Sequence, residues 1–280
     1  MSRNTTSPRG LPARRQREMA RFLRTRTDSV VDHGTLAARF EVSEQTVRRD
    51  LRKLEAEGVV QRTFGGAIVH GQHERTEPAF HTRETREAGA KHALAQAALQ
   101  ELSPGEGLFL DASSTVLFLA RALPRQWRGD AATAGLPALA ELAARPEVRL
   151  TVLGGEYQRS SNCIRGDALL RQLRALRFDT AVISARAVHP QLGLCEADPE
   201  EAALKRAVVA ISRRVLVLVD HTKLHRTAAH HYADLDDVSV LLTDAGASDD
   251  AIADLRKATS TPIRASSGSP PPIAAGSNGC

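Results

Sequence analysis

The fold of this chain is decided by one stretch, Ser43-Glu44-Gln45-Thr46-Val47-Arg48-Arg49-Asp50-Leu51. Ser43 suits the N-cap of a helix, because its hydroxyl can accept a hydrogen bond from a backbone N–H that the first turn leaves unpaired. Apolar residues then recur at i, i+4 and i+7, which predicts one buried stripe: Val47, Leu51 and Leu54. Amide and guanidinium side chains fall on the opposite side: Gln45, Arg48, Arg49 and Arg52.

A helix of this kind suits the major groove of DNA, because Gln and Arg pair with base edges and Arg also pairs with phosphates. A helix face that bears Arg is, however, more often only a solvated face. The charge distribution favours the DNA interpretation. Residues 1–70 hold 14 Lys and Arg against 8 Asp and Glu, whereas residues 71–280 hold 24 against 25. This positive excess predicts an anionic partner for the N-terminal part of the chain.

The neighbours of this stretch complete a small domain. The expected elements are helices at 14–26, 35–40 and 43–57, followed by short strands at 59–60 and 67–69. Gly58 is expected as a left-handed C-cap, and Gly65-Gly66 as the turn between the strands. Three helices and a hairpin predict a winged helix-turn-helix over residues 14–70. The polar segment 1–13 before it is predicted to be disordered.

The remainder of the chain predicts a second, larger α/β domain over residues 83–262, after a polar linker at 71–82. Apolar strand candidates lie at 107–110, 148–153, 178–183, 215–219 and 238–242. Helical patterns lie at 84–102, 115–123, 136–144, 167–175, 199–212 and 249–259. Because the strands are continuous apolar runs that alternate with helices, they predict a mainly parallel sheet covered on both faces. Residues 263–280, rich in Ser, Gly and Pro, are predicted to be a disordered tail.

The composition argues against several classes of protein. The sequence has no run of about 18 apolar residues, so no membrane-spanning helix is predicted. The polar N-terminus also lacks the apolar segment of a signal peptide. Three cysteines stand far apart: Cys163, Cys195 and Cys280. This spacing indicates neither a disulfide framework nor a zinc site. The histidines at 221, 225, 230 and 231 offer no clear third ligand, so we expect no metal and no other cofactor. Without a membrane helix or a signal peptide, the expected location is the cytoplasm.

Polar loops follow several expected strands, at the edge where ligands of parallel sheets bind. After the first strand, Asp111-Ala112-Ser113-Ser114-Thr115 opens a helix, and its hydroxyls suit a phosphate cradle as well as they suit ordinary capping. Later in the chain, Lys223 is expected either to neutralise a phosphate or to lie on a solvated loop. Glu201 and Lys205 are four residues apart and are predicted to form a surface ion pair.

Two sets of motifs occur together in this chain. The first comprises Val42–Leu51, Leu54, Gly58 and Arg62-Thr63-Phe64-Gly65-Gly66-Ala67. The second comprises Arg83, Lys91, Leu110-Asp111, Ser114-Thr115, Gly154-Gly155, Gly166, Gly193-Leu194, Asp198, Glu201, Lys205, Asp220, Thr222-Lys223 and Thr243-Asp244. Together they resemble DeoR-type bacterial transcriptional regulators. The resemblance implies a homo-oligomer that binds double-stranded operator DNA, and a sensor domain similar in fold to ribose-5-phosphate isomerase that binds a phosphorylated sugar.

The resemblance also implies candidate site residues. Those expected to contact DNA are Ser43, Gln45, Thr46, Arg48, Arg49, Arg52 and, in the wing, Arg62. Those expected at or beside the effector are Asp111, Ser113, Ser114, Thr115, Arg186, Asp198, Glu201 and Lys223. Ser113 and the loop Ser184-Ala185-Arg186-Ala187 stand where the family has glycines, so the expected pocket is reshaped or narrowed. Arg186 either supplies a bidentate phosphate contact there or fills the site.

Two functions remain open from the sequence. The first is a sequence-specific transcriptional regulator that represses carbohydrate genes. A phosphorylated sugar would bind the regulator and relieve this repression. The second is a sugar-phosphate isomerase or deaminase with an accessory DNA-binding domain. Its enolisation chemistry would use carboxylates and a lysine: Asp111, Asp198, Glu201 and Lys223. Because the resemblance is to the sensors and the loop glycines are replaced, the non-enzymatic regulator is the preferred hypothesis.

Overall fold

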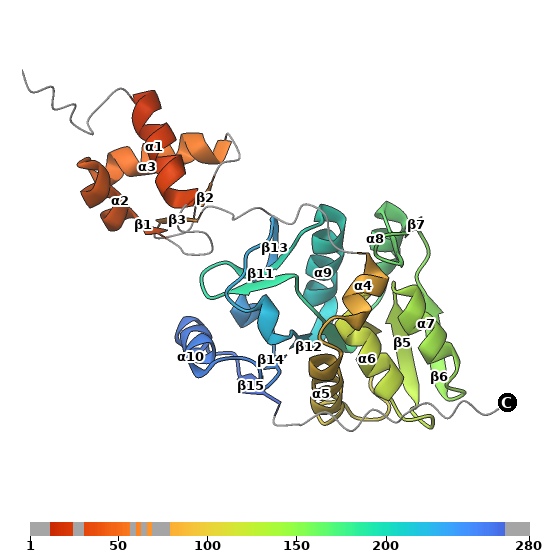
Figure 1. Ribbon diagram of the computed structural model, residues 1–280. Helices are drawn as coiled ribbons and strands as arrows, with labels where there is room; N and C mark the ends of the chain where they lie inside the picture. Colours follow the sequence, from red (N-terminus) through yellow and green to blue (C-terminus); the bar gives the residue numbers. More distant parts are fainter. Residues whose placement is uncertain (1–11, 25–30, 57–59, 63–65, 69–78, 267–280) are drawn as a thin grey trace, which may run out of the picture. The chain divides into compact units, whose positions relative to one another are not determined.

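The computed structural model describes residues 12–24, 31–56, 60–62, 66–68 and 79–266 (Figure 1). The chain divides into two compact units, Met1–Glu74 and Arg75–Cys280. Several expected features lie outside the described residues: segment 1–11, the C-cap at Gly58, the Phe64-Gly65 part of the wing, most of the linker, and the tail from residue 267. No helix in the described ranges is both long enough and apolar enough to cross a membrane.

The first unit is a helical domain with a small antiparallel sheet. Its elements are α1 (Pro12–Arg24), β1 (Val31–Asp32), α2 (His33–Phe40), α3 (Glu44–Ala56), β2 (Gln61–Arg62) and β3 (Gly66–Ile68). The hydroxyl and the N–H of Thr35 both donate to Asp32, which caps α2, and these bonds lower the pKa of Asp32. Glu41 ends α2 in the left-handed region at φ 50°, and its N–H donates to the carbonyl of Ala37. This tight turn delivers the chain into α3.

The link expected to be polar between the first two helices contains a strand. In β1, Val31 lies opposite Ala67 of β3, so the wing is a three-stranded sheet in the order β1-β3-β2. A Cβ atom on Gly66 would lie 2.2 Å from the carbonyl oxygen of Val31, so only glycine allows this approach. The apolar core of the unit includes side chains from all three helices and the sheet: Met19, Leu23, Val31, Leu36, Phe40, Val47, Leu51, Leu54, Val60 and Ala67.

The second unit is built on a seven-stranded parallel sheet in the order β15-β14-β12-β9-β4-β5-β6. Its strands are β4 (Leu108–Leu110), β5 (Gly129–Thr133), β6 (Val148–Val152), β9 (Phe178–Ile183), β12 (Ser212–Leu218), β14 (Val240–Thr243) and β15 (Ile263–Ala265). Its helices are α4 (Phe80–Thr85), α5 (Ala88–Leu99), α6 (Ser114–Ala122), α7 (Leu136–Ala143), α8 (Asp167–Leu173), α9 (Pro199–Ile211) and α10 (Asp249–Ala258).

Alternate residues of the strands face two separate apolar layers. Leu108 and Leu110 pack with α5, α6 and α7, whereas Phe109 between them packs with α8, α9 and α10. Strand β12 shows the same alternation, with Leu216 on the first face and Val217 on the second. The prediction of a parallel sheet covered on both faces is therefore confirmed (Figure 1).

Smaller strands lie beside the main sheet. They form an antiparallel sheet of β10 (Ala187–His189), β11 (Gly193–Glu196) and β13 (His230–Ala233), and a hairpin of β7 (Glu156–Gln158) and β8 (Cys163–Arg165). None of these was among the expected strands, and neither was β5. The segment 263–265, which the sequence places in the tail, is strand β15 and pairs with β14. A strand of three residues is too short to give a periodic signal.

The single helix expected over 84–102 is wrong. Two helices, α4 and α5, are separated by extended Arg86 and left-handed Glu87, whose φ angles are −71° and 50°. The break contains neither glycine nor proline, so nothing in the sequence marks it. Helix α5 also ends at Leu99, three residues earlier than expected.

Candidate functional site

Helix α3 of the first unit has the two faces that its sequence predicts. The Ser43 hydroxyl accepts the N–H of Thr46 at 3.2 Å, which caps the first turn. Val47, Leu51 and Leu54 are at most 3% exposed and lie in the core. The cap and the apolar stripe together fix which way the opposite face points.

The opposite face of α3 is solvent-accessible. Its exposed side chains include Gln45, Arg48, Arg49 and Arg52. Thr46 is half-buried, with its hydroxyl 3.0 Å from that of Ser43. Arg48 lies 3.4 Å from Glu44, but both side chains are more than half exposed, so the pair holds Arg48 only weakly. In the wing, the backbone of Arg62 pairs with Ala67 in the β2–β3 ladder.

Asp50, on the buried side of α3, has a structural role that the sequence reading missed. It is 2% exposed, and its carboxylate accepts hydrogen bonds from Arg15 at 2.6 Å and Gln16 at 2.8 Å. Both partners lie on α1, so this group fixes α1 against α3. The signal was available in the sequence, because Asp50 stands three residues after Val47, on the apolar side of the helix.

The second unit has a switch point at the carboxyl ends of β4 and β9. These strands are neighbours, but the chain proceeds from β4 to β5 on one side and from β9 to β12 on the other. The loops after them therefore diverge, at the position where α/β proteins generally bind ligands. Asp111, just after β4, accepts the N–H of Ser184, just after β9, at 3.0 Å.

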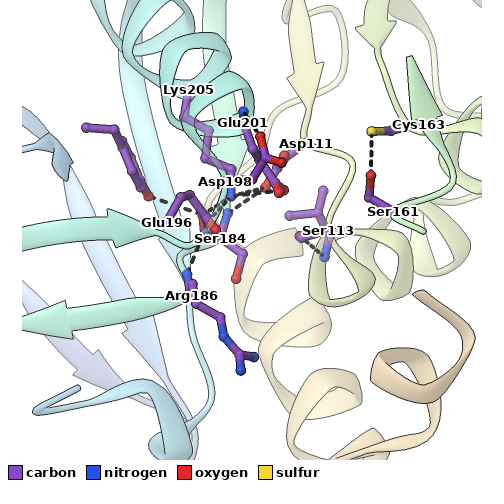
Figure 2. Close-up of polar contacts among 12 residues, drawn as sticks. Asp111, Ser113, Ser161, Cys163, Ser184, Arg186, Glu196, Asp198, Glu201 and Lys205 are labelled. Atoms are coloured by element: carbon purple, nitrogen blue, oxygen red, sulfur yellow. Dashed lines mark hydrogen bonds and ion pairs between the residues drawn. The ribbon is translucent and has the colours of Figure 1, made fainter. Parts of the chain in front are cut away.

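A buried lysine, Lys205, lies at this switch point (Figure 2). The Lys205 ammonium lies 2.5 Å from a carboxylate oxygen of Glu196, 2.7 Å from the carbonyl of Ser184 and 3.2 Å from Asp111. Lys205 is 1% exposed, so the prediction of a surface pair with Glu201 is wrong. Glu201 is its more distant partner, at 3.8 Å.

This group keeps Lys205 charged. Burial alone would lower the pKa of Lys205, but the carboxylates of Asp111, Glu196 and Glu201 outweigh it and raise the pKa well above its usual value. The same cluster leaves one acceptor unused. The second carboxylate oxygen of Asp111, Oδ1, is buried and has no hydrogen-bond partner.

The start of α6 and the start of α9 lie at the same edge of the sheet. Ser113 caps α6, with its hydroxyl accepting the N–H of Val116 at 3.2 Å, and Ser114 and Thr115 are buried beside it. Asp198 caps α9 and also accepts a hydrogen bond from Arg165 at 2.8 Å. Burial would raise the pKa of Asp198, but the Arg165 guanidinium and the backbone N–H groups of α9 lower it. Arg165 was not among the expected site residues.

A cationic group, consisting of Lys223, Lys91 and Arg186, lies around the loop after β12. The Lys223 ammonium lies 3.6 Å from Asp220 and donates to the Thr222 hydroxyl at 3.1 Å. Burial lowers the pKa of Lys223, and the nearby charge of Arg186 lowers it further. Burial also lowers the pKa of Lys91, on α5, to about 8, with Lys223 acting in the same direction. The fold therefore concentrates positive charge at this loop.

Arg186 belongs to the cationic group more than to the Lys205 cluster. Its backbone N–H donates to Glu196 at 3.1 Å, while its side chain extends away from Lys205 and Asp111 (Figure 2). Burial lowers the pKa of Arg186. Of the expected effector residues, Asp111, Ser113 and Glu201 lie near the end of β4 and Lys205. Arg186 and Lys223 gather around the loop after β12.

Of the clustered histidines, His230 and His231 lie in β13, whereas His221 and His225 line a groove. Its volume is about 440 Å³, and its lining includes His221, His225, Asp250 and Asp254. The ring Nδ1 of His221 lies 2.9 Å from Asp244, and His225 Nε2 lies 3.2 Å from the carbonyl of Ala251. Within the described part of the chain, no three His, Cys, Asp or Glu side chains are arranged to hold a metal ion.

A winged helix-turn-helix with an exposed basic helix, followed by an α/β unit with buried polar groups at its switch point, is typical of a DNA-binding regulator with a ligand-sensing domain. Comparison with known families gives the same class. A sequence model described as the DeoR C terminal sensor domain matches residues 86–245, and one described as the DeoR-like helix-turn-helix domain matches residues 15–73. The chain therefore belongs to the DeoR family of transcriptional regulators, and the resemblance and fold class expected from the sequence are confirmed.

Two relatives and one solved structure illustrate the similarity. The transcriptional repressor AccR of Agrobacterium fabrum is 30% identical over 214 residues, which are 76% of this chain and 83% of AccR. The glycerol-3-phosphate regulon repressor of Escherichia coli is 29% identical over 219 residues, 78% of this chain and 84% of that protein. Ribose 5 phosphate isomerase A from Neisseria gonorrhoeae matches 49% of this chain and 53% of its own, with 14% identity and a TM-score of 0.36.

Proposed function

We propose that this regulator is a repressor that binds operator DNA through α3 and the wing, and leaves it when a phosphorylated sugar binds the second unit. The observation that supports the effector class best is the pair of lysines near the loop after β12: Lys91, which is buried, and Lys223, which is half-buried. A buried ammonium group is costly unless an anion accompanies it. Asp220 supplies one carboxylate near both lysines, and a phosphate group would supply further negative charge. The relative named for the glycerol-3-phosphate regulon supports a phosphorylated ligand.

On the DNA side, the exposed face of α3 would enter the major groove. Gln45, Arg48 and Arg49 are the candidates for base-edge or phosphate contacts, with Arg52 beside them. Ser43 and Thr46 would approach the backbone at the start of the helix, where N–H groups favour phosphates. Arg62 of the wing would contact the backbone or the minor groove. A homo-oligomer in the cytoplasm, reading repeated half-sites, completes this proposal.

On the effector side, two groups of side chains near the switch point would bind two parts of the ligand. Lys223, Lys91 and Arg186 would neutralise the phosphate group. The unpartnered Oδ1 of Asp111 would accept a hydrogen bond from a sugar hydroxyl, because a buried acceptor without a donor is costly. The N-termini of helices α6 and α9 would contribute Ser114, Thr115 and the carboxylates of Asp198 and Glu201. Ser113 already caps α6 and would shape the wall of the site.

The chemistry of Lys205 weighs against the alternative of an isomerase or deaminase. A lysine that acts as a base or forms a covalent intermediate must lose its proton near neutral pH. Three carboxylates hold Lys205 in its charged form, which leaves Lys91 and Lys223 as the other lysines of this region. The relatives are also named as transcriptional regulators. A turnover assay with pentose and hexose phosphates tests the point, and any robust rate that Lys223→Ala abolishes would establish the enzyme instead.

Thermal unfolding with a panel of sugar phosphates tests the proposed effector class. Each compound is paired with its unphosphorylated parent, and a ligand at a hundredfold its Kd should stabilise the folded protein by about 2.7 kcal/mol. We expect at least one phosphorylated compound to raise the Tm while its parent does not. Equal stabilisation by a sugar and its phosphate would show that the cations do not bind phosphate, and the proposal would fail.

A further inference from the structure

Helices α4 and α5 follow one another without forming a continuous helix. Arg86 is extended, and Glu87 takes a left-handed conformation at φ 50°, which residues with a Cβ atom rarely adopt. The break leaves carbonyl groups at the end of α4 without the N–H donors that a continuing helix would supply. These carbonyls are half-enclosed by the protein, so they need other partners.

Lys91 supplies the missing donors. Its ammonium donates to the carbonyl of Arg83 and, at 2.6 Å, to the carbonyl of Arg86. Lys91 lies in the first turns of α5 and is only 4% exposed, so its side chain reaches back across the break. A positive charge at the C-terminal end of a helix is favourable, because the free carbonyls there are negative. Lys91 therefore anchors the end of α4.

The same ammonium is within electrostatic range of the loop after β12. Burial is the main reason that its pKa falls to about 8, and Asp220 and Lys223 are near enough to change that pKa in opposite directions. The ring of Phe118 lies below the ammonium, 6.0 Å away. One side chain thus links the end of α4 to the loop proposed to bind phosphate.

The other end of α4 is held by the β7–β8 hairpin. The N–H of Phe80 donates to the carbonyl of Ser160, between the two strands, at 2.8 Å. The Phe80 side chain is 5% exposed, and the Arg83 guanidinium lies 5.5 Å from the centre of its ring. Helix α4 is therefore held by the hairpin at its first residue and by Lys91 at its other end.

We propose that Lys91 has two alternative partners. In the free protein it holds the end of α4 through the carbonyls of Arg83 and Arg86, and it leaves these carbonyls when a phosphate group binds beside Lys223. The inference rests on the proposed function, since it requires phosphate at that loop. An ammonium prefers a charged phosphate oxygen to a neutral carbonyl, because charge-assisted hydrogen bonds are roughly twice as strong. Helix α4 is the first described element after the segment that connects the two units. Its release would carry the signal toward the DNA-binding unit as a shift between two populated states.

Hydrogen exchange of the full chain at neutral pH tests the anchor, with inorganic phosphate as the probe and chloride at equal ionic strength as the reference. We expect phosphate to speed exchange in residues 80–86 by about tenfold, within the usual range of coupling between sites, while α5 is unaffected. Binding of phosphate is measured in parallel by thermal unfolding. If phosphate binds but exchange in α4 is unchanged, the anchor is wrong and the proposed effector site stands. If phosphate and sugar phosphates all fail to bind, the proposed effector site is itself wrong, and the inference falls with it.

The variant Lys91→Met, of similar length but without donors, tests the anchor in the absence of ligand. Exchange in α4 should be as fast without phosphate as it is in the wild-type protein with phosphate, and adding phosphate should change nothing further. Lys257→Met is the matched control, because Lys257 is 76% exposed on α10 and pairs only with Asp254 among the ion pairs described. Wild-type protection of α4 in Lys91→Met would overturn the inference. If that variant does not fold, the wild-type comparison decides alone.

Discussion

The outer face of helix α3 in the first unit and the carboxyl edge of the sheet in the second unit differ in how far their polar side chains are exposed to solvent. On the outer face of α3, the arginines are exposed, and the ion pair of Arg48 with Glu44 is loose. At the sheet edge, Lys205 and Asp111 are buried and bonded to one another. DNA is a large external polyanion, and exposed, adjustable groups suit it. A small ligand requires buried groups whose positions the protein fixes before binding.

The largest expected effect lies in the buried cluster. Lys205→Met removes the counter-charge of Asp111 and Glu196 and should lower the free energy of unfolding of the second unit by about 3–5 kcal/mol. The chain has one tryptophan, Trp127, which is buried in this unit, so its fluorescence during urea denaturation reports the loss. Lys257→Met, an exposed pair, should change stability by less than about 0.5 kcal/mol. Equal effects in the two variants would contradict the description of Lys205.

The first unit has its own buried charge, with a smaller expected effect. Asp50→Ala removes two hydrogen bonds to α1 and leaves Arg15 without its carboxylate, at a cost of about 2–3 kcal/mol. Hydrogen exchange of α1 and α3 under mild denaturant would show the loss. The Trp127 transition should not shift, because the substitution lies in the other unit. A shift of that transition alone would mean that Asp50 does not stabilise the first unit.

On the exposed face of α3, the effect should be on binding and not on stability. Arg48→Ala should weaken operator binding by about 1–3 kcal/mol if Arg48 contacts a base, and should leave the unfolding transitions unchanged. An operator duplex selected from random sequences, followed by fluorescence anisotropy, measures the affinity. The control is Arg177→Ala, an exposed arginine of the second unit. Unchanged affinity at moderate salt would remove Arg48 from the proposed contacts.

The cationic group predicts a dependence of effector affinity on pH. Lys91 has a pKa of about 8, so it is charged below that pH and loses its charge above it. A phosphate ester stays doubly charged across this range, because its second pKa is about 6. Phosphate affinity should therefore be highest between about pH 6 and about pH 8, and should fall by up to about tenfold per pH unit above pH 8. Isothermal titration with the compound found by thermal unfolding checks this, and an affinity that is flat from neutral pH upward would exclude Lys91 from the site.

The same contrast explains what the sequence could predict. The face of α3 follows from its period, because Val47 and Leu51 define the buried side. Helices α6, α9 and α10 begin within one residue of their expected starts, because each follows a capping residue: Ser113, Asp198 and Ser248. Sequence periodicity thus suffices where one helix decides the arrangement.

The sensor site depends on contacts between distant segments, and there the sequence reading was incomplete. Lys205 looked like a surface residue because Glu201 stands four positions before it, yet Glu196 and Asp111 surround it through the fold of the sheet. Strand β5 carries alanines at 131 and 132, which give little strand signal. The role of Lys91 depends on a helix break that no glycine or proline marks.

The central claim is that a phosphorylated ligand bound at the loop after β12 releases operator DNA. The direct test is operator release, measured by anisotropy, as the phosphorylated compound identified by thermal unfolding is added to the wild-type protein and to Lys223→Ala. The wild-type protein should leave the operator, whereas Lys223→Ala should stay bound at the same ligand concentration, because one of the phosphate-binding cations is gone. Release of Lys223→Ala at the wild-type concentration would contradict the account.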